Sequence, residues 1–328
     1  MPSNSSLTPQ TLQTVKPLVM IVGPTAVGKT HFSITLAQSI SGEIISADSR
    51  QFYRGMDIGT AKPDLNERAD VPHHLMDIAD PDETIDLTRF HHLLDQATQE
   101  IYARGHLPVM VGGTGQYARS ILQGWDIPAQ PPDPRLRSAL LKWADDLGPF
   151  PFHDRLKRLD PEAAVFIQPQ NVRRVVRAME VILSTGRKFS DQRQQHEPEY
   201  RVLMIGLLRE RSELYARIDV RIDQMIADGL LDEVKNLLQR GYPPSLPALS
   251  AIGYKEMVDV LQGSLSMGEA VVIMKHRTRE YVRRQANWFK PGDPNIHWFH
   301  PDEEGIVEKA VGLIKKFLAG IEDAHPVE

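Results

Sequence analysis

A glycine-rich loop near the amino terminus limits what this chain can fold into more than any other feature. The loop consists of Gly23, Pro24, Thr25, Ala26, Val27, Gly28, Lys29 and Thr30. Before it, the apolar residues 18–22 predict a buried parallel strand, and after it the sequence has helical periodicity. A strand, a loop of this spacing and a helix predict an α/β P-loop NTPase-like fold, with a parallel sheet flanked by helices.

The residue types in the loop predict a diphosphate-binding site. Gly23 and Gly28 allow the backbone to wrap so that its N–H groups point into one concavity. Lys29 can reach the phosphates, the Thr30 hydroxyl can ligate Mg²⁺, and the following helix directs its positive end at the anion. We therefore expect the whole loop to bind diphosphate and Thr30 to bind the metal. Because many enzyme classes share such a loop, it does not determine the reaction.

Polar residues follow two further apolar runs in the first 125 residues. Residues 43–47 are followed by Asp48, Ser49, Arg50 and Gln51, and residues 109–111 by Gly112, Gly113, Thr114 and Gly115. A helical stretch over residues 87–103 separates the two runs. Since parallel strands end at the same edge of a sheet, the segments that begin at Gly23, Asp48 and Gly112 should cluster there.

The rest of the chain predicts a domain organisation with one insertion. Residues 1–16 are rich in Ser, Thr, Gln and Pro and read as a disordered tail. The prolines of "GWDIPAQPPDP" mark a linker into a helical insertion subdomain over residues 126–200, and the catalytic core comprises residues 17–125 and 201–328. In the second part of the core we expect a strand over 202–208, a short last strand over 295–300, and helices over 212–225, 230–239, 254–261 and 266–289.

Composition excludes several function classes. The chain has no cysteine, which rules out thiolate catalysis, disulfides and cysteine-ligated metals, and its apolar runs are too short to span a membrane. We expect a cytoplasmic protein. The net charge of −5 does not favour nucleic acid, but basic residues cluster locally, and local patches decide contact with a phosphate backbone. The clusters contain Lys275, Arg277, Arg279, Arg283, Arg284 and Lys290, and Arg173, Arg174 and Arg177.

The absence of certain sequence motifs argues against some classes of nucleotide-binding enzyme, but the residues alone leave other classes open. The chain has no Asn-Lys-x-Asp segment, which argues against a GTPase, and no strand that ends in Asp-Glu, which argues against a helicase or transporter ATPase. A small-molecule kinase remains. Asp48 could be a Mg²⁺ ligand, a strand-end cap or a general base. Arg217 and Arg221, one helical turn apart, could form a solvated face or bind an anion.

Further segments resemble the tRNA dimethylallyltransferase family over roughly residues 17–300. They are "SADSRQFYRGMDIGTAKP", "VPHHLMDI", "VMVGGTGQY", "NVRRVVRAMEV", "AIGYKEM" and "TREYVRRQANWF". The resemblance implies transfer of a dimethylallyl group from dimethylallyl diphosphate to the exocyclic N6 amine of adenosine 37 in tRNA. This adenosine is 3′ of the anticodon, in tRNAs that read codons starting with U, and diphosphate is released.

The resemblance also implies roles for individual residues. Asp48 is the general base, Thr114 lies near the acceptor base, and one arginine of the 217/221 pair contacts the diphosphate. The implied catalytic residues are Asp48, Lys29, Thr30, Thr114, Arg217 and Arg221. The implied tRNA-binding residues are Asp48, Ser49, Arg50, Gln51, Thr114, Arg137, Arg173, Arg174, Arg177, Arg279, Arg283, Arg284 and Gln285. The cofactor is Mg²⁺, the partner is the anticodon stem-loop of tRNA, and we expect a monomer.

Two alternatives stay open at this stage. Prenylation of free AMP, ADP or ATP uses the same chemistry, although a mononucleotide would not need the basic helix or the helical insertion. A small-molecule kinase, or an RNA-binding module that keeps an inactive loop, belongs to a different class.

Overall fold

The computed structural model describes residues 8–125, 133–191 and 197–324. Most of the predicted proline-rich linker lies outside these ranges. The chain divides into two compact units, residues 1–122 with 199–328 and residues 123–198. Their borders are within three residues of those expected for the core and the insertion at 126 and 200. Within the ranges described, none of the helices combines the length and hydrophobicity that a membrane crossing requires.

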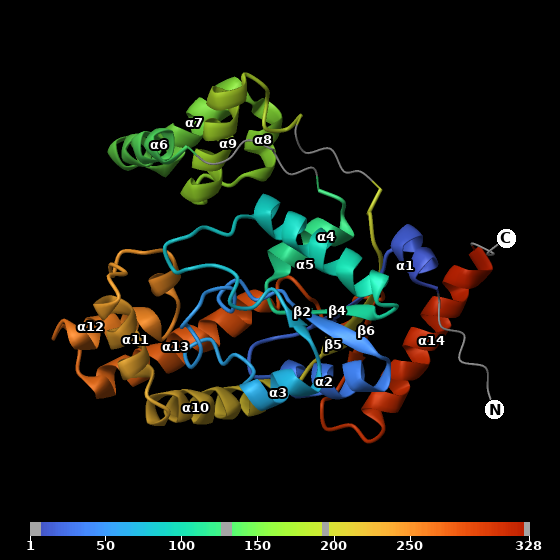
Figure 1. Ribbon diagram of the computed structural model, residues 1–328. Coiled ribbons are helices and arrows are strands. Elements are labelled where there is room, and N and C mark those ends of the chain that lie inside the picture. Colours follow the sequence, from blue (N-terminus) through green and yellow to red (C-terminus); the bar gives the residue numbers. More distant parts are fainter. Residues whose placement is uncertain (1–7, 126–132, 192–196, 325–328) are drawn as a thin grey trace, which may run out of the picture. The chain divides into compact units, whose positions relative to one another are not determined.

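The larger unit is built on a six-stranded, fully parallel sheet with the strand order β3-β2-β4-β1-β5-β6. Figure 1 shows this sheet between layers of helices. The strands are β1 (Pro17–Val22), β2 (Gly42–Ser46), β3 (His73–His74), β4 (Leu107–Gly112), β5 (Arg201–Leu207) and β6 (Ile296–Phe299). The α/β fold with a parallel sheet is confirmed. The short strand β3 was not predicted, because two residues carry no periodicity.

Helices cover both faces of the sheet, which explains why β1 is apolar throughout. Val19 and Ile21 join one core, whereas Leu18, Met20 and Val22 join the other. Helices α4 and α5 line the second core, and α2, α10 to α14 the first. The helices of this unit are α1 (Pro9–Val15), α2 (Lys29–Ser39), α3 (Leu65–Asp70), α4 (Leu87–Ala103), α5 (Gly115–Leu122), α10 (Arg211–Ala227), α11 (Leu230–Gln239), the 3₁₀ helix η1 (Ala248–Ser250), α12 (Tyr254–Leu261), α13 (Met267–Gln285) and α14 (Ile306–Ala324).

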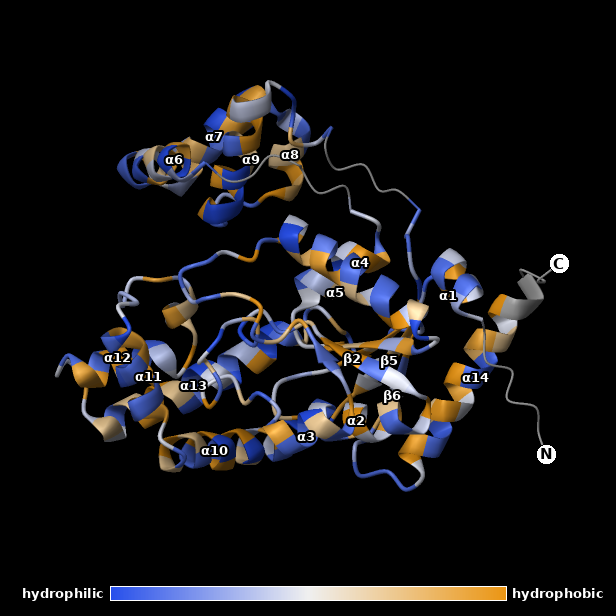
Figure 2. Ribbon diagram, viewed as in Figure 1, coloured by the Kyte–Doolittle hydropathy of each residue, from blue (hydrophilic) through white to orange (hydrophobic). Residues whose placement is uncertain are grey.

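The amphipathic character of the outer helices is visible in Figure 2. Helix α10, and α14 over its coloured part, carry both hydrophobic and hydrophilic residues. In α10 the buried side chains Leu214, Ile218, Ile222 and Met225 recur at intervals of three and four residues, which places them on one face. Burial of this face attaches the helix to the first core.

The smaller unit is helical, as the periodicity predicted, and has a core of its own. It contains α6 (Pro134–Leu147), α7 (Pro149–Leu159), α8 (Pro161–Phe166) and α9 (Val172–Thr185). Proline occupies the first turn of α6, α7 and α8, where a missing N–H costs nothing. Phe152, Leu156, Val175 and Met179 are fully buried against one another.

Two sequence predictions about element boundaries are wrong. Residues 9–15 of the expected disordered tail form α1, whose Leu12 and Val15 pack against Tyr102 and Ile321. The signal was present, because Thr8 caps the helix and Pro9 occupies its first turn. Helix α13 ends at Gln285 and not near residue 289. Lys290 precedes a proline, which disfavours helical backbone there, so the chain turns before it.

Candidate active site

The three predicted polar segments meet at one edge of the sheet. They follow β1, β4 and β2, which are neighbours in the sheet. The prediction that the three segments cluster is therefore confirmed. The pocket at this edge is formed by residues of the larger unit only. Its lining is Lys29, Thr30, Ser33, Ile44, Ser46, Asp48, Gln51, Pro63, His73, Met76, Val111 and Gly112.

The phosphate loop owes its shape to backbone conformations that favour glycine. Gly23 and Gly28 have φ values of 148° and 112°. A Cβ atom at Gly23 would lie 2.6 Å from the carbonyl oxygen of Leu207, so the close approach of β5 excludes any side chain there. The Lys29 Nζ donates to the carbonyl oxygens of Gly23 and Pro24 at 3.0 and 2.9 Å, which keeps the amine inside the loop.

The electrostatics of the pocket separate the two candidate arginines. Burial lowers the pKa of Lys29 to about 8, while the charge of Asp48 raises it and that of Arg221 lowers it. Burial also lowers the pKa of Arg221, again against the effect of Asp48. Arg221 therefore interacts electrostatically with both Lys29 and Asp48. Arg217 instead donates from Nε to the carbonyl oxygen of Ala26 at 2.9 Å.

A hydrogen-bonded turn orients Asp48 after β2. Its Oδ1 accepts from the N–H of Arg50 at 2.9 Å, and its carbonyl oxygen accepts from the N–H of Gln51 at 3.1 Å. The Ser46 hydroxyl donates to Oε1 of Gln51 at 2.8 Å. Phe52, fully buried, stacks on Phe90 and Tyr117 and so attaches the turn to α4 and α5. One oxygen of Asp48 remains for chemistry in the pocket.

Residues in and beside this turn contact other elements of the larger unit. The Arg50 guanidinium donates to the carbonyl oxygen of Pro247 at 2.9 Å, so it joins the turn to η1. Ser49 lies half-buried in the turn. Burial raises the pKa of Tyr281 to about 12, and the charge of Asp48 adds to the effect. Tyr281, on α13, therefore interacts electrostatically with Asp48.

Close packing explains the glycines at the end of β4. A Cβ atom at Gly112 would lie 2.6 Å from the carbonyl oxygen of Ala47, and one at Gly115 would lie 2.1 Å from Cγ of Trp288. At Gly113 it would lie 2.2 Å from Nε2 of Gln285. Thr114 follows directly and its carbonyl oxygen accepts from the N–H of Tyr117 at 3.1 Å, at the start of α5.

Gln285, predicted to bind tRNA, is used inside the protein instead. Its side chain is buried, its Oε1 accepts from the N–H of Thr25 at 2.8 Å, and its Nε2 donates to the carbonyl oxygen of Gly113 at 3.2 Å. The amide thus connects the phosphate loop to the end of β4. The physical reason for this correction is that α13 ends against both segments, which sequence periodicity cannot show.

Two of the motif segments, 46–63 and 251–257, pack on each other. The Glu233 carboxylate accepts from the N–H groups of Asp57 and Ile58 at 3.0 and 2.8 Å and from the Tyr254 hydroxyl at 2.6 Å. A Cβ atom at Gly59 would lie 2.4 Å from the Tyr254 ring. This contact fixes the loop that carries Pro63 into the pocket.

The arginines of α13 differ in what they contact. Arg279 pairs with Asp219 at 2.5 Å and lies over the Tyr215 ring, so its side chain connects α13 to α10. Arg283 and Arg284 are exposed at the carboxyl end of the helix. Among the described residues, Arg283 pairs only distantly with Glu280, at 3.9 Å, and Arg284 lies over the Tyr281 ring at 6.0 Å. Arg283 and Arg284 therefore remain the residues of α13 that we expect to bind a phosphate backbone.

The arginines of the smaller unit surround a buried carboxylate. Glu180 is 1% exposed and accepts from Arg137 at 2.6 Å and from Arg177 at 3.1 Å. Both arginines therefore stabilise the fold of this unit as well as any tRNA contact they make. Arg173 and Arg174 lie exposed in the first turn of α9.

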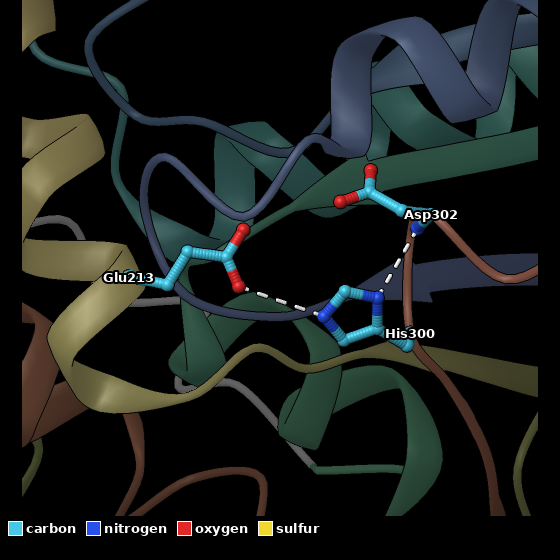
Figure 3. A group of neighbouring side chains, drawn as sticks. All are labelled: Glu213, His300 and Asp302. Atoms are coloured by element: carbon cyan, nitrogen blue, oxygen red, sulfur yellow. Dashed lines mark hydrogen bonds and ion pairs between the residues drawn. The ribbon is translucent and has the colours of Figure 1, made fainter.

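One cluster of side chains outside the pocket resembles a metal site in composition. Glu213, His300 and Asp302 bring their ligand atoms within 4.8 Å of one another (Figure 3). However, Arg209 pairs with both Glu213 and Asp302, so a guanidinium already serves as the partner of these carboxylates. The His300 Nδ1 accepts from the N–H of Asp302 at 3.3 Å. The donor set does not fit a metal ion.

Comparison with known proteins gives one consistent result. The family described as IPP transferase matches residues 51–292. The tRNA dimethylallyltransferase of Roseiflexus sp. (strain RS-1) is 48% identical over 302 residues, which cover 92% of this chain and 99% of that protein. The tRNA dimethylallyltransferase of Thermomicrobium roseum is 47% identical over 303 residues, 92% of each chain.

Solved structures agree with the sequence relatives. The full-length tRNA isopentenylpyrophosphate transferase of Bacillus halodurans superposes with a TM-score of 0.70 at 41% identity, over 94% of this chain and 98% of that one. A eukaryotic dimethylallyltransferase acting on tRNA superposes with a TM-score of 0.77 at 28% identity, over 93% and 80%.

Proposed function

Because the chain belongs to the IPP transferase family, we propose that it transfers a dimethylallyl group from dimethylallyl diphosphate to an adenosine of tRNA. The acceptor is the exocyclic N6 amine of adenosine 37, 3′ of the anticodon, in tRNAs that read codons starting with U. The observation that carries the proposal is the placement of Asp48 in one pocket with Lys29 and Thr30. A carboxylate base and a diphosphate site thereby share a single cavity.

The donor end of the pocket matches a prenyl diphosphate. The loop N–H groups, Lys29 and Arg221 supply positive charge for the diphosphate. Beside them, apolar side chains offer a wall for the five-carbon chain, and these are Ile44, Pro63, Met76 and Val111. Of the arginine pair in α10, Arg221 is the better candidate for the diphosphate, because it interacts electrostatically with both Lys29 and Asp48.

The pocket also suits Mg²⁺. The Thr30 hydroxyl and the Asp48 carboxylate are the oxygen donors that Mg²⁺ prefers, and both line the pocket beside the loop. When bound, Mg²⁺ neutralises the charge that grows on a departing diphosphate. Thr30 is the residue we assign to hold it.

The reaction is a substitution at carbon. The adenine N6 attacks the allylic carbon, a C–N bond forms, and the C–O bond to diphosphate breaks with its electron pair going to the leaving group. Lys29, Arg221 and the loop N–H groups stabilise that charge where it develops. The amine is a weak nucleophile because its lone pair is delocalised into the ring, so Asp48 takes its proton as the bond forms. Gln51 and Thr114 border the acceptor side.

Recognition of tRNA relies on exposed arginines and on shape. Arg283 and Arg284 on α13, and Arg173 and Arg174 on α9, are candidates for contacts with the phosphates of the anticodon stem-loop. Bases of an anticodon loop can be splayed out, which lets one adenine enter the pocket. We also propose that a monomer is active.

Product analysis tests the proposal. Purified protein with Mg²⁺ and labelled dimethylallyl diphosphate is offered tRNA in one reaction and AMP in another, and digestion of the tRNA product locates the label. We expect label on the adenosine 3′ of the anticodon and none on AMP. Label on AMP alone would indicate the mononucleotide reaction. Titration calorimetry should show tighter binding of dimethylallyl diphosphate than of ATP, and phosphoryl transfer from ATP would indicate a kinase.

A further inference from the structure

Two arginines hold the phosphate loop from the side opposite its diphosphate-binding concavity. The Arg209 Nε donates to the carbonyl oxygen of Val27 at 3.0 Å, and the Arg217 Nε donates to that of Ala26 at 2.9 Å. The Arg209 side chain is only 3% exposed, whereas Arg217 is exposed. Both come from the segment that leaves β5 and enters α10, far from the loop in sequence. Consecutive peptide groups of the loop are therefore held by side chains.

Arg209 is itself held in a fixed orientation. Its Nη1 and Nη2 donate to the two carboxylate oxygens of Asp302, both at 2.6 Å, and Nη1 also pairs with Glu213. The neighbouring Pro301 packs at the loop, since a Cβ atom at Gly28 would lie 3.6 Å from Cβ of Pro301. Figure 3 shows the carboxylate of Glu213 beside the His300 ring and that of Asp302 above it. The cluster thus serves as a support for Arg209 and not as a cation site.

The geometry of a trans peptide gives these contacts a consequence for ligand binding. The C=O and N–H of one peptide group point in opposite directions, and the described residues contain no cis peptide bond. When Arg209 holds the carbonyl of Val27 outward, the N–H of Gly28 must point inward. The N–H of Val27 is already used within the loop, because it donates to the carbonyl oxygen of Pro24 at 3.4 Å. The contact with Arg209 therefore directs the N–H of Gly28 into the loop before any anion arrives.

We propose that Arg209, supported by Asp302, is a positioning residue that orients the N–H of Gly28 toward the diphosphate, with Arg217 as a second point of attachment to the loop. The inference rests on the diphosphate site of the proposed function. It moves Arg217 from direct contact with the diphosphate to the outside of the loop. It also explains why a buried guanidinium is kept beside the loop, since its charge is balanced by Asp302 and its remaining N–H acts on the loop alone.

Binding of inorganic diphosphate tests this directly. Arg209→Met keeps most of the side chain's volume and removes all its donors. In titration calorimetry at fixed Mg²⁺, we expect diphosphate to bind about 10- to 100-fold more weakly than to the parent, the usual effect of losing a charged hydrogen bond. Arg201→Met is the matched control, because Arg201 is exposed at the opposite end of β5 and the same exchange there should leave binding unchanged.

A second variant keeps the proposal testable if Arg209→Met does not fold. Asp302→Asn leaves Arg209 in place but weakens its support, and we expect a smaller loss of diphosphate affinity in the same direction. In transfer assays with either variant, KM for dimethylallyl diphosphate should rise while KM for tRNA stays the same. Unchanged diphosphate affinity in a folded Arg209→Met protein overturns the proposal. So does a loss of thermal stability with both KM values altered equally, because that result indicates a purely structural role.

The readout separates this inference from the proposed function. Diphosphate binding needs no turnover, so a protein that binds diphosphate but transfers no prenyl group contradicts only the proposed function. A protein that transfers prenyl groups normally in the Arg209→Met form contradicts only the positioning role.

Discussion

At the scale of single residues, Asp48 is the residue to test first, because its position suits two different roles. Its turn leaves one carboxylate oxygen directed to a pocket that also contains Lys29 and Thr30. That position suits a proton acceptor and also a ligand of Mg²⁺. The two roles respond differently to the exchange of the carboxylate for an amide, which has the same size but no basicity.

We expect Asp48→Asn to lower single-turnover transfer by about 10²- to 10⁴-fold, the usual contribution of a general base. Affinity for both substrates should change little, because the base acts in the transition state. Transfer is measured across a titration of Mg²⁺. Recovery of the rate at high Mg²⁺, or a defect seen only in diphosphate affinity, would assign Asp48 to the metal.

Lys29 gives the pocket a pH dependence. Burial lowers the pKa of its ammonium group to about 8, so above that pH the unliganded protein loses the charge that attracts diphosphate. Bound diphosphate favours the charged form and raises this pKa again. We therefore expect diphosphate affinity to fall above pH 8 and binding at pH 8 to 9 to take up a proton.

Calorimetry in buffers of different ionisation enthalpy measures this proton uptake. In Lys29→Arg the side chain stays charged throughout this range, so its binding should lack the uptake that Lys29 causes. Equal proton uptake by both proteins would assign the titration to another group.

At the scale of elements, α13 serves two purposes along its length. Its middle is attached to neighbouring helices, because Arg277 pairs with the buried Glu256 and Arg279 with Asp219. Its end carries Arg283 and Arg284 into solvent, and Gln285 into the site. The basic helix thus contains arginines that pair with acidic residues of neighbouring helices, and Arg283 and Arg284 at its end, which are the candidates for a ligand.

Charge reversal at the end of α13 tests its contact with tRNA. We expect Arg283→Glu with Arg284→Glu to weaken tRNA binding and to reduce the slope of log affinity against log salt by about 0.7 to 0.9 per lost phosphate contact. Diphosphate affinity should stay the same. The same charge change in Lys315→Glu with Lys316→Glu, exposed on α14, is the control and should leave the slope unchanged. If both pairs shift the slope equally, the effect is one of net charge.

At the scale of the whole molecule, a buried carboxylate joins elements at the edge of the sheet opposite the site. Glu43 on β2 is 1% exposed and accepts from Arg104 at 2.8 Å, His74 at 2.6 Å and His106 at 2.7 Å. Burial by itself raises the pKa of Glu43, but the hydrogen bonds from Arg104, His74 and His106 lower it to about 2. Glu43 therefore links β2 to β3 and to the turn between α4 and β4.

The hydrogen bonds of Glu43 predict a contribution to stability that is lost in acid. The folded pKa is lower than the ordinary value of 4.5, so the contribution is complete above pH 4.5 and is lost as the pH falls toward 2. At neutral pH we expect Glu43→Gln to lower the free energy of unfolding by about 3 kcal/mol, as for other buried ion pairs that lose one partner. The difference from the parent protein should shrink between pH 4.5 and pH 2.

Urea unfolding at several pH values measures the effect. Glu303→Gln is the control, since Glu303 pairs with Lys309 at the surface, where such pairs contribute little. A constant difference between parent and Glu43→Gln across the acid range would contradict the assignment.

The sequence by itself determined the strand, the phosphate loop and the helix, the α/β class, and Asp48 as the residue to test. These features depend on contacts between residues close in the chain, where spacing and residue type are decisive. The tertiary structure distinguishes Arg217, which donates to the carbonyl oxygen of Ala26, from Arg221, which interacts with Lys29 and Asp48, although the two share one helix face. It also decided that Gln285 belongs to the loop and that Arg209 supports it. Those partners lie far apart in sequence, and only the folded sheet edge brings them within hydrogen-bonding distance.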